Sequence, residues 1–486
     1  MSQRAATCEG VGMNPPNESP GPFANPAMQP DDDANRLATR NARLFMAFRI
    51  LFNVRFYYPV FMILFLDFGI TLEQFGLLNA AWAAAIVLLE VPSGALADLI
   101  GRKRLLVAAG GLMVVEMLAL CLVPVPSAWV FPALLLNRIV SGVAEAFASG
   151  ADEALAYDSL IAAGRAEEWP RVLERLMQVG AFVTMTAMVT GSLLYTPGPL
   201  NTLAAAVGLP ATLTAADTFR LPVWLTLGSA LGVVVVTLAM REPPRDQPPT
   251  SQGLLAPFRQ TAATGWWILA HPMVMVVILA GVLFDQPIRQ LLVVSSEIYR
   301  QIAIPEPAFG FVAAGTAILS LVAASPIRRL AMETTPRRNF LVIAAVTLAG
   351  LVGTACFVPW WGVVFSMLLS LTMRMLMFLQ SHYLNQLVGS DRRATVLSFR
   401  GLAINVSYGV MSLVFSAAVA AAEAGGFASA ASPTTAEQPA FRFVVGLLPI
   451  YFVIATALFA GGVFWLVRDR DGFCGRGGFA GGDLES

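Results

Sequence analysis

Charged residues are scarce in this chain of 486 residues. They make up 13% of the sequence, whereas hydrophobic residues make up 57%, and the mean hydropathy is +0.68. A soluble domain is roughly one quarter charged, so this chain lacks the polar side chains to cover a water-exposed surface. The solvent that suits it is a lipid bilayer, which a helix crosses with about 20 mostly apolar residues.

Cysteine and histidine are also rare, which excludes most metal and redox chemistry. The four cysteines form no CxxC pair and have no zinc-type spacing with a histidine. Neither His271 nor His382 has a partner at metal-ligand spacing. No Ser/His or His/Asp/Glu constellation of an enzyme is present. We therefore expect no metal, no cofactor and no enzymatic activity.

Neither sign of charge is in excess. The chain has 31 basic and 31 acidic residues, so its formal net charge is zero. A basic excess that would indicate a nucleic-acid partner is therefore missing, and we expect none. Nearly all the basic residues are arginines, since Lys103 is the only lysine.

Long apolar segments dominate the sequence, and twelve of them are long enough to span a bilayer. They are 44–66, 74–95, 105–125, 129–152, 174–196, 221–240, 267–288, 307–327, 340–358, 361–385, 396–421 and 443–467. The connection 197–220 is ambiguous, because its "LNTLAAAVGLPATL" is apolar enough for a re-entrant or interfacial piece. We expect an all-α membrane protein.

A polar segment divides the spans into six and six. It begins with the proline-rich "REPPRDQPPTSQG", and we assign residues 242–266 to a cytoplasmic linker. The six-helix bundles then comprise residues 44–241 and 267–467, as expected of two repeated halves. The terminal segments 1–43 and 468–486 lack an apolar core and are predicted to be disordered cytoplasmic tails. Residues 1–43 do not form a signal peptide.

The basic residues predict the orientation in the membrane. Fifteen of them lie in the connections on one side of the twelve spans and four lie on the other side. The basic side is cytoplasmic by the positive-inside rule, so both termini are cytoplasmic. An odd number of spans would place one terminus outside. We expect a multi-pass protein of a bacterial inner membrane, surrounded by the lipid bilayer and monomeric.

The loop after the second span reads "GALADLIGRKR", residues 94–104. It resembles the signature of the major facilitator superfamily, a Gly, an Asp and a Gly-Arg-Lys/Arg between spans two and three. The matching residues are Gly94, Asp98, Gly101, Arg102 and Arg104. The resemblance implies twelve helices in two six-helix bundles, the major facilitator fold. In that family this loop is a gating element that holds the two halves together on the cytoplasmic side, so it does not indicate the substrate.

A second pattern of the same family lies in span four. Leu134, Arg138 and Gly142 match its Leu, Arg and Gly at intervals of four residues. In many proton-coupled members the arginine takes part in proton transfer. Drug–proton antiporters commonly carry a glycine–proline pattern in span five, whereas this span has Gly180 and Gly191 and no proline there.

Span four contains the charges most suggestive of function. Arg138, Glu145 and Asp152 are each seven residues apart and share one face of a continuous helix. Seven residues rise about 10.5 Å, so a proton relay or water bridge fits between Arg138 and Glu145. Either residue could instead pair with another span, for example Glu145 with Arg55 or Arg374, as a structural brace. Asp152 and Glu153, near the cytoplasmic end, are expected to hold Arg102 of the loop.

Three more intramembrane charges are candidates for the cavity, because ionisable groups within spans are costly and usually functional. Arg55 lies near mid-membrane in span one, although it could also extend toward the interface. Arg374 in span ten lies in "LTMRMLMF", a pattern that fits a pocket or a lipid-facing surface. Asp285 in span seven could bind substrate or a proton, or pair with Arg289 four residues on.

The resemblance implies a secondary transporter that moves a small molecule by alternating access, and these charges are its candidate cavity residues. The excess of arginine over acid in our candidate cavity favours an anionic or zwitterionic substrate, and Glu145 is the candidate to exchange protons. We favour export, with uptake symport or uniport as the alternative. A non-transporting sensor or scaffold of the same fold is a further alternative, although no large soluble domain supports it.

Overall fold

The computed structural model describes residues 32–210, 212–243, 256–427 and 438–468. Within these ranges the chain is helical and contains no strand. Twelve segments are long and apolar enough to cross a membrane, which confirms the predicted number of spans. The protein is an integral multi-pass membrane protein.

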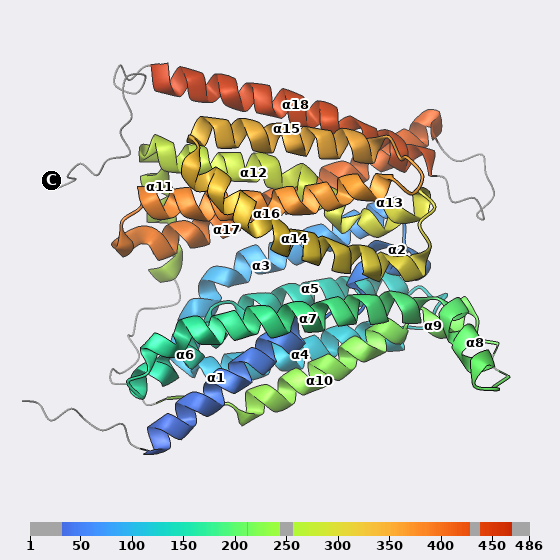
Figure 1. Ribbon diagram of the computed structural model, residues 1–486, viewed down its shortest axis with the longest axis horizontal. Helices are drawn as coiled ribbons and strands as arrows, with labels where there is room; N and C mark the ends of the chain where they lie inside the picture. Colours follow the sequence, from blue (N-terminus) through green and yellow to red (C-terminus); the bar gives the residue numbers. More distant parts are fainter. Residues whose placement is uncertain (1–31, 211, 244–255, 428–437, 469–486) are drawn as a thin grey trace, which may run out of the picture.

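The first half of the chain forms the lower group of helices in Figure 1. Its first span is broken into α1 (Asp32–Asn53), η1 (Tyr58–Val60) and α2 (Phe61–Asp67). The other spans are α3 (Leu72–Ile100), α4 (Arg102–Leu122), α5 (Val130–Ala148), α7 (Trp169–Tyr195) and α10 (Leu221–Ala239). Three short helices connect them: α6 (Ala151–Ala162), α8 (Pro197–Ala206) and α9 (Ala215–Thr218).

The second half forms the upper group of helices. Its spans are α12 (Pro272–Val293), α14 (Phe309–Glu333), α15 (Pro336–Ala355), α16 (Gly362–Leu387), α17 (Ser390–Ala422) and α18 (Pro439–Arg468). Helix α11 (Ala256–Ala270) precedes them, and α13 (Ser295–Gln301) and η3 (Glu306–Ala308) lie between α12 and α14. The two groups of six spans are the predicted architecture.

Local sequence signals mark where several spans begin. Pro170, Pro222, Pro272 and Pro336 each occupy the first turn of a helix, where the missing N–H is not needed. Helix α3 begins with a capping box, in which Thr71 and Gln74 bond each other's backbone N–H. Polar signals therefore fix the helix starts that hydropathy alone leaves uncertain.

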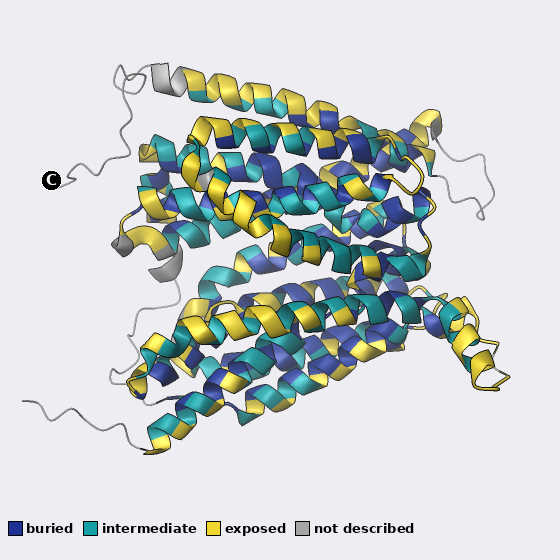
Figure 2. Ribbon diagram, in the orientation of Figure 1, coloured by how far each residue is buried: buried dark blue, intermediate teal, exposed yellow. Residues whose placement is uncertain are grey.

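Large apolar side chains remain exposed along the outward faces of the spans (Figure 2). Phe182 on α7, Val322 on α14 and Leu458 on α18 are each more than 70% exposed. Lipid tails are as apolar as these side chains, so such faces need no protein cover. Polar and charged residues are instead found among the buried ones, between the helices.

Two predicted segment boundaries are wrong. Residues 32–43 belong to the predicted disordered tail but form the first turns of α1, because Ala38, Asn41 and Ala42 are buried against neighbouring helices. The Asn41 side chain donates hydrogen bonds to Ser159 Oγ at 2.8 Å and to the Arg241 carbonyl at 2.7 Å. In the linker, residues 256–266 belong to helix α11, so the seventh span starts at Pro272. Residues 1–31 and 469–486 lie outside the described ranges.

The two ends of the helical bundle differ. One end, here the terminal end, contains the first and last described residues, and the other, here the α8 end, contains α8, α9 and α13 (Figure 1). The halves meet where α3 packs on α17 and α7 packs on α14. Near the α8 end a Cβ added to Gly310 would lie 2.2 Å from the Met188 carbonyl oxygen, and one added to Gly76 would lie 2.5 Å from Ser416 Cβ. Only glycine allows so close an approach of the two halves.

Candidate functional site

A break in the first span places Arg55 inside the bundle. Residues between α1 and η1 leave the helix just before Pro59, which has no N–H to continue it. Arg55 Nη1 donates to Glu116 Oε1 of α4 at 2.8 Å, and the two residues are 3% and 0% exposed. The guanidinium carbon also lies 5.7 Å from the centre of the Phe52 ring. Arg55 is therefore a buried, paired cation and does not extend to the membrane surface.

Arg138 on α5 is buried without a carboxylate partner among the described residues. Its Nη2 donates to Asn79 Oδ1 at 3.1 Å, and its Nε has no hydrogen-bond acceptor. The guanidinium carbon lies 5.3 Å from the Phe61 ring centre and 5.2 Å from that of Trp82. Two aromatic faces stabilise the cation but leave donors that a ligand could use.

Glu145 lies two turns further along α5, on the same face as Arg138 and toward the terminal end. Its side chain is exposed, and within the described part of the chain it makes no hydrogen bond or ion pair. The alternative pairing of Glu145 with Arg55 or Arg374 is not present. A carboxylate without a partner can take up and release a proton without breaking another contact.

Helix α12 of the second half contributes a further cation. Arg289 Nε and Nη2 donate to the two oxygens of Asp285, each at 2.8 Å. Asp285 is buried, and Arg289 lies with its guanidinium carbon 5.5 Å from the Tyr408 ring centre of α17. Of the alternatives for Asp285, the structure shows the pair with Arg289. The arginine is the member of the pair that reaches the cavity described next.

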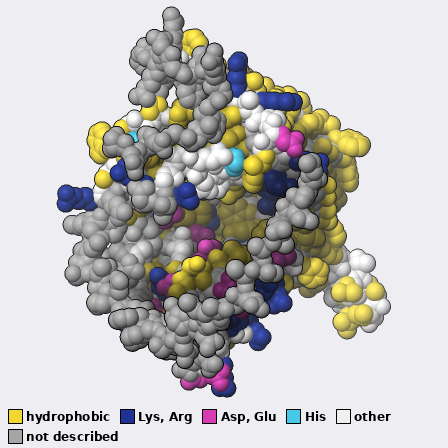
Figure 3. All heavy atoms as spheres, turned by 60° about the vertical axis from the view of Figure 1, so that its left-hand side comes forward, with side chains coloured by type: hydrophobic (Ala, Val, Ile, Leu, Met, Phe, Trp, Pro, Cys, Tyr) yellow, Lys and Arg dark blue, Asp and Glu magenta, His cyan; other side chains and the backbone are white. Residues whose placement is uncertain are grey.

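A cavity of about 350 Å³ lies between the two halves. Its lining includes Arg55, Arg138 and Glu145 from the first half and Arg289 and Tyr408 from the second. Figure 3, which brings the terminal end forward, shows a hollow between the halves with hydrophobic side chains inside it and acidic side chains around it. The structure therefore brings together three of the five predicted cavity residues, and Asp285 lies behind Arg289, which lines the same cavity.

Arg374 is the predicted residue that the structure does not bring to this cavity. It lies on α16 with an exposed side chain and makes no contact with the other candidates. Sequence reasoning instead missed Arg289 as a lining residue and Glu116 as the partner of Arg55. The i, i+4 spacing of Asp285 and Arg289 indicates their ion pair from the sequence. The pair of Arg55 and Glu116 joins spans one and three, and no sequence spacing indicates it.

The family-like loop forms a sharp corner between α3 and α4 at the terminal end. Gly101 has φ +98°, and a Cβ there would lie 2.8 Å from Glu242 Oε2. Glu242 accepts from the backbone N–H of Arg102 at 2.9 Å, so a carboxylate caps the start of α4. Arg104 is exposed, and no described atom lies within 4 Å of a Cβ at Gly94, so no close approach of another helix requires a glycine there.

The partner predicted for Arg102 is wrong. Arg102 pairs with Asp158, and Asp152 pairs with Arg49, whose Nε lies 2.5 Å from Asp152 Oδ2. The reason is a helix break: α5 ends at Ala148, and α6 begins after Gly150 at φ +75°. Asp152 therefore does not continue the face of Arg138 and Glu145. The side chain of Asp98 lies outside the described part of the structure.

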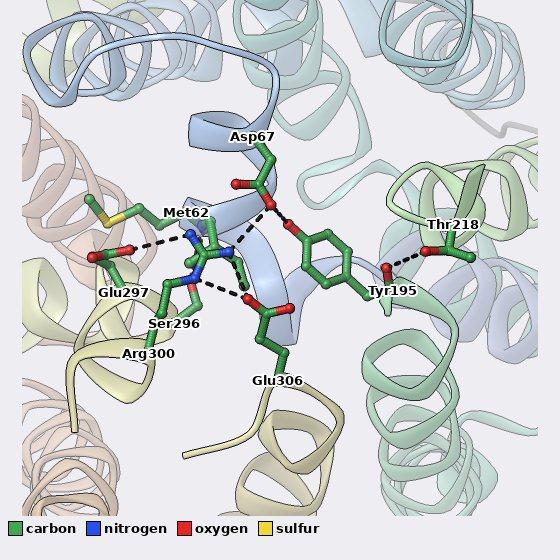
Figure 4. A network of polar contacts seen from close by, with 9 residues as sticks. Met62, Asp67, Tyr195, Thr218, Ser296, Glu297, Arg300 and Glu306 are labelled. Carbon is green, nitrogen blue, oxygen red and sulfur yellow. Dashed lines mark hydrogen bonds and ion pairs between the residues drawn. The ribbon is translucent and has the colours of Figure 1, made fainter. Parts of the chain in front are cut away.

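A polar network closes the cavity at the α8 end (Figure 4). We call it the seal; it comprises Asp67 and Tyr195 of the first half and Ser296, Arg300 and Glu306 of the second. Arg300 Nη2 lies 2.8 Å from Glu306 Oε1 and 3.3 Å from Asp67 Oδ2, and Tyr195 Oη donates to the same Asp67 oxygen. Ser296 Oγ accepts from the Met62 N–H at 3.1 Å.

The charges of the seal depend on one another. Burial disfavours the cation of Arg300, but Asp67 and Glu306 outweigh this and hold its pKa above the ordinary value. Glu297, 3.9 Å from Arg300 Nη1, is buried, and burial raises its pKa. Hydrogen bonds between described residues of the two halves lie at this end, including Ser192 Oγ to the Pro307 carbonyl at 3.0 Å. The polar bonds described here therefore tie the halves together at the α8 end.

Comparison with solved structures shows that the chain has the major facilitator fold. A bacterial homolog of the human lysosomal transporter Spinster, inward-facing and unoccupied, matches with TM-score 0.65 and 14% identity, covering 90% of this chain and 98% of that one. The D323A mutant of the nucleoside transporter NupG matches with TM-score 0.64, 10% identity and coverage of 87% and 99%. A D-xylose–proton symporter matches with TM-score 0.53, 12% identity and coverage of 87% and 97%. No protein-family model and no curated protein sequence matches the chain.

Proposed function

We propose that this chain is a secondary transporter that moves a small organic solute by alternating access. The observation that carries the proposal is the charged cavity between the halves, closed at the α8 end by the seal and hollow at the terminal end. The solved structures that share the fold are named as transporters of nucleosides, of xylose with protons, and as a Spinster homolog.

The terminal end is the cytoplasmic end in this proposal. The basic residues of the connections gather there, and the positive-inside rule assigns such an end to the cytoplasm. The cavity then opens inward, and the likeness to an inward-facing Spinster homolog agrees with this assignment. Transport requires the seal to open and the terminal end to close.

Protons are the proposed coupling ion, and Glu145 is the group that carries them. It lines the cavity and has no partner among the described residues, whereas Glu116 and Asp285 are each held by an arginine. Arg138 lies on the same face of α5 and lines the same cavity, so both charges can face one solute. Protonation of Glu145 thus changes the charge of the cavity by one unit without breaking an ion pair.

The substrate is proposed to be anionic or zwitterionic. With Arg289 and Glu116 included, three arginines and three carboxylates lie in or behind the cavity, so their charges balance when Glu145 is ionised. An ionised Glu145 next to the unpaired Arg138 suits a zwitterion. A protonated Glu145 leaves one positive charge, which suits an anion. We favour export by a monomer in the bacterial inner membrane, with uptake as the alternative.

Transport in inverted membrane vesicles with an imposed proton gradient tests this proposal. Wild-type vesicles should accumulate an anionic or zwitterionic solute from a screened set, and Glu145→Gln should abolish the part driven by the gradient. Glu333→Gln is the matched control, because it removes an exposed carboxylate at the end of α14, away from the cavity. Gradient-driven transport that survives Glu145→Gln would refute the role of Glu145. Failure of every solute in both directions would favour a sensor or scaffold.

A further inference from the structure

The first turns of α1 carry a row of arginines on one face. Arg36, Arg40 and Arg43 have the i, i+4, i+7 spacing that aligns side chains along a helix, and all three are exposed. The opposite face, with Ala38 and Ala42, is buried against α6 and its surroundings. This basic face is not part of the cavity or of the loop between α3 and α4.

A surface pocket of about 580 Å³ lies on this face. Four arginines line it, the three of α1 and Arg165, together with one acid, Asp32, and the polar side chains of Asn35 and Thr39. We call it the α1 pocket. Its size suits a phosphorylated headgroup, and its excess of cations suits an anion.

The four arginines have different roles. Arg165 Nη1 donates to Thr39 Oγ1 at 2.8 Å, its Nε and Nη2 hold Glu168 at 2.8 Å, and Arg40 Nη2 donates to the Ala239 carbonyl at 2.6 Å. These two arginines hold the wall of the pocket in place. Arg36 and Arg43 make no hydrogen bond or ion pair within the described part of the chain, so their donors are available to a ligand.

The α1 pocket lies at the level of the membrane surface. Arg40 reaches the last residue of the apolar helix α10, so the arginines lie where a span ends. Two residues beyond Arg43, the Phe45 ring lies 5.3 Å from that of Trp169, which in turn lies 5.6 Å from Tyr157. Tryptophan and tyrosine concentrate at membrane–water interfaces. A ligand in this pocket would therefore lie among lipid headgroups.

We propose that the α1 pocket binds the phosphate of an anionic phospholipid headgroup, with Arg36 and Arg43 as its direct ligands. The acyl chains would lie beside the apolar part of α1, which begins at Leu44. This inference is independent of the transport proposal, because it depends only on the basic face and its level in the membrane.

Titration of the purified full-length protein with phosphatidylglycerol and with phosphatidylcholine, read by native mass spectrometry, tests this site. The wild type should bind phosphatidylglycerol more tightly, and Arg36→Gln/Arg43→Gln should weaken that binding roughly 30-fold, since each basic residue near an anionic headgroup contributes about fivefold. Arg36→Lys/Arg43→Lys keeps the charge and should keep most of the affinity. Arg337→Gln/Arg338→Gln is the matched control, because it removes two exposed arginines elsewhere, at the start of α15.

Three outcomes would overturn the proposal. Unchanged affinity in Arg36→Gln/Arg43→Gln would exclude these two residues as ligands. An equal loss in the α15 control would show a general charge effect and no defined pocket. Displacement of the lipid by inorganic phosphate at a similar concentration would assign the pocket to a soluble anion. Because both substituted arginines are exposed and unbonded within the described residues, we expect the variants to fold, and size-exclusion chromatography checks this.

Discussion

The buried pair of Arg55 and Glu116 makes the substitution Arg55→Leu informative. Glu116 is 0% exposed; Arg55 holds its Oε1, and its Oε2 has no hydrogen-bond partner. Arg55→Leu therefore leaves a buried carboxylate without any side-chain partner. Breaking a buried pair in this way costs about 3–5 kcal/mol, whereas replacing both partners with apolar residues is often neutral or stabilising.

A double-mutant cycle measures this effect. We expect Arg55→Leu to be destabilised by about 4 kcal/mol, and Arg55→Leu/Glu116→Leu to recover most of that loss. Membrane proteins often unfold irreversibly in detergent, so the practical measurement is the half-life of the folded protein at a fixed elevated temperature. If half of the loss affects the unfolding rate, the half-life of the single variant should fall about 30-fold.

Two results would refute this reasoning. A single variant as stable as the wild type would show that Glu116 does not depend on Arg55. A double variant no more stable than the single one would show that the loss comes from packing around the break in the first span. Arg55→Leu/Glu116→Gln, which keeps the shape of Glu116 and removes its charge, separates these cases, since it should recover stability only if the unpaired charge causes the loss.

Three further predictions concern the seal and the loop. Arg300→Gln should shift the protein toward opening at the α8 end, because Asp67, Glu297 and Glu306 then lose their shared cation. Spin-label distances between α8 and η4 (Glu423–Phe427) should then lengthen, and unchanged distances would contradict this prediction. Burial raises the pKa of Glu297, which lies beside Arg300 of the seal. The protonated side chain should therefore stabilise the closed end fully below the ordinary glutamate pKa of about 4.3, and this stabilisation should be lost as the pH rises through the raised pKa. The same spin-label distances should report this pH dependence, and Glu297→Gln should remove it. Gly101→Ala should destabilise the protein by about 1–3 kcal/mol, because Gly101 has a positive φ and its Cβ would contact Glu242. Gly111→Ala is the control, since no described atom lies near a Cβ on that glycine of α4, and it should be neutral or stabilising. Thermal stability of the two variants and the wild type checks this.

Hydropathy predicts the spans because the backbone in lipid must satisfy its own hydrogen bonds, which leaves helices long enough to cross. It could not predict the first turns of α1, because residues 32–43 are polar and their helix depends on tertiary contacts of Asn41 with Ser159 and Arg241. The repeat of seven from Arg138 to Glu145 is valid inside α5, and both residues line the cavity. It fails at Asp152, because Gly150 ends that helix.

Partners across different helices could not be predicted from spacing at all. Arg55 meets Glu116 instead of Glu145, and Arg102 meets Asp158 instead of Asp152, because helix rotation and depth decide which charges face each other. Arg289 could be paired with Asp285 because both lie on one helix. Intramembrane charge therefore indicates which residues matter, and three-dimensional packing decides what each one contacts.

The glycine contacts between the halves have a mechanical consequence. At Gly310 the α14 backbone lies against the Met188 carbonyl of α7, and at Gly76 the α3 backbone lies against Ser416 of α17. A glycine has no side chain to interlock with the other half, so these two points can act as pivots when the halves rotate, with few rotamer changes there. Resistance to rotation at this end then includes the polar bonds of the seal, which must break for the halves to part there. The rate at which the α8 end opens and closes should accordingly depend on how many bonds of the seal break.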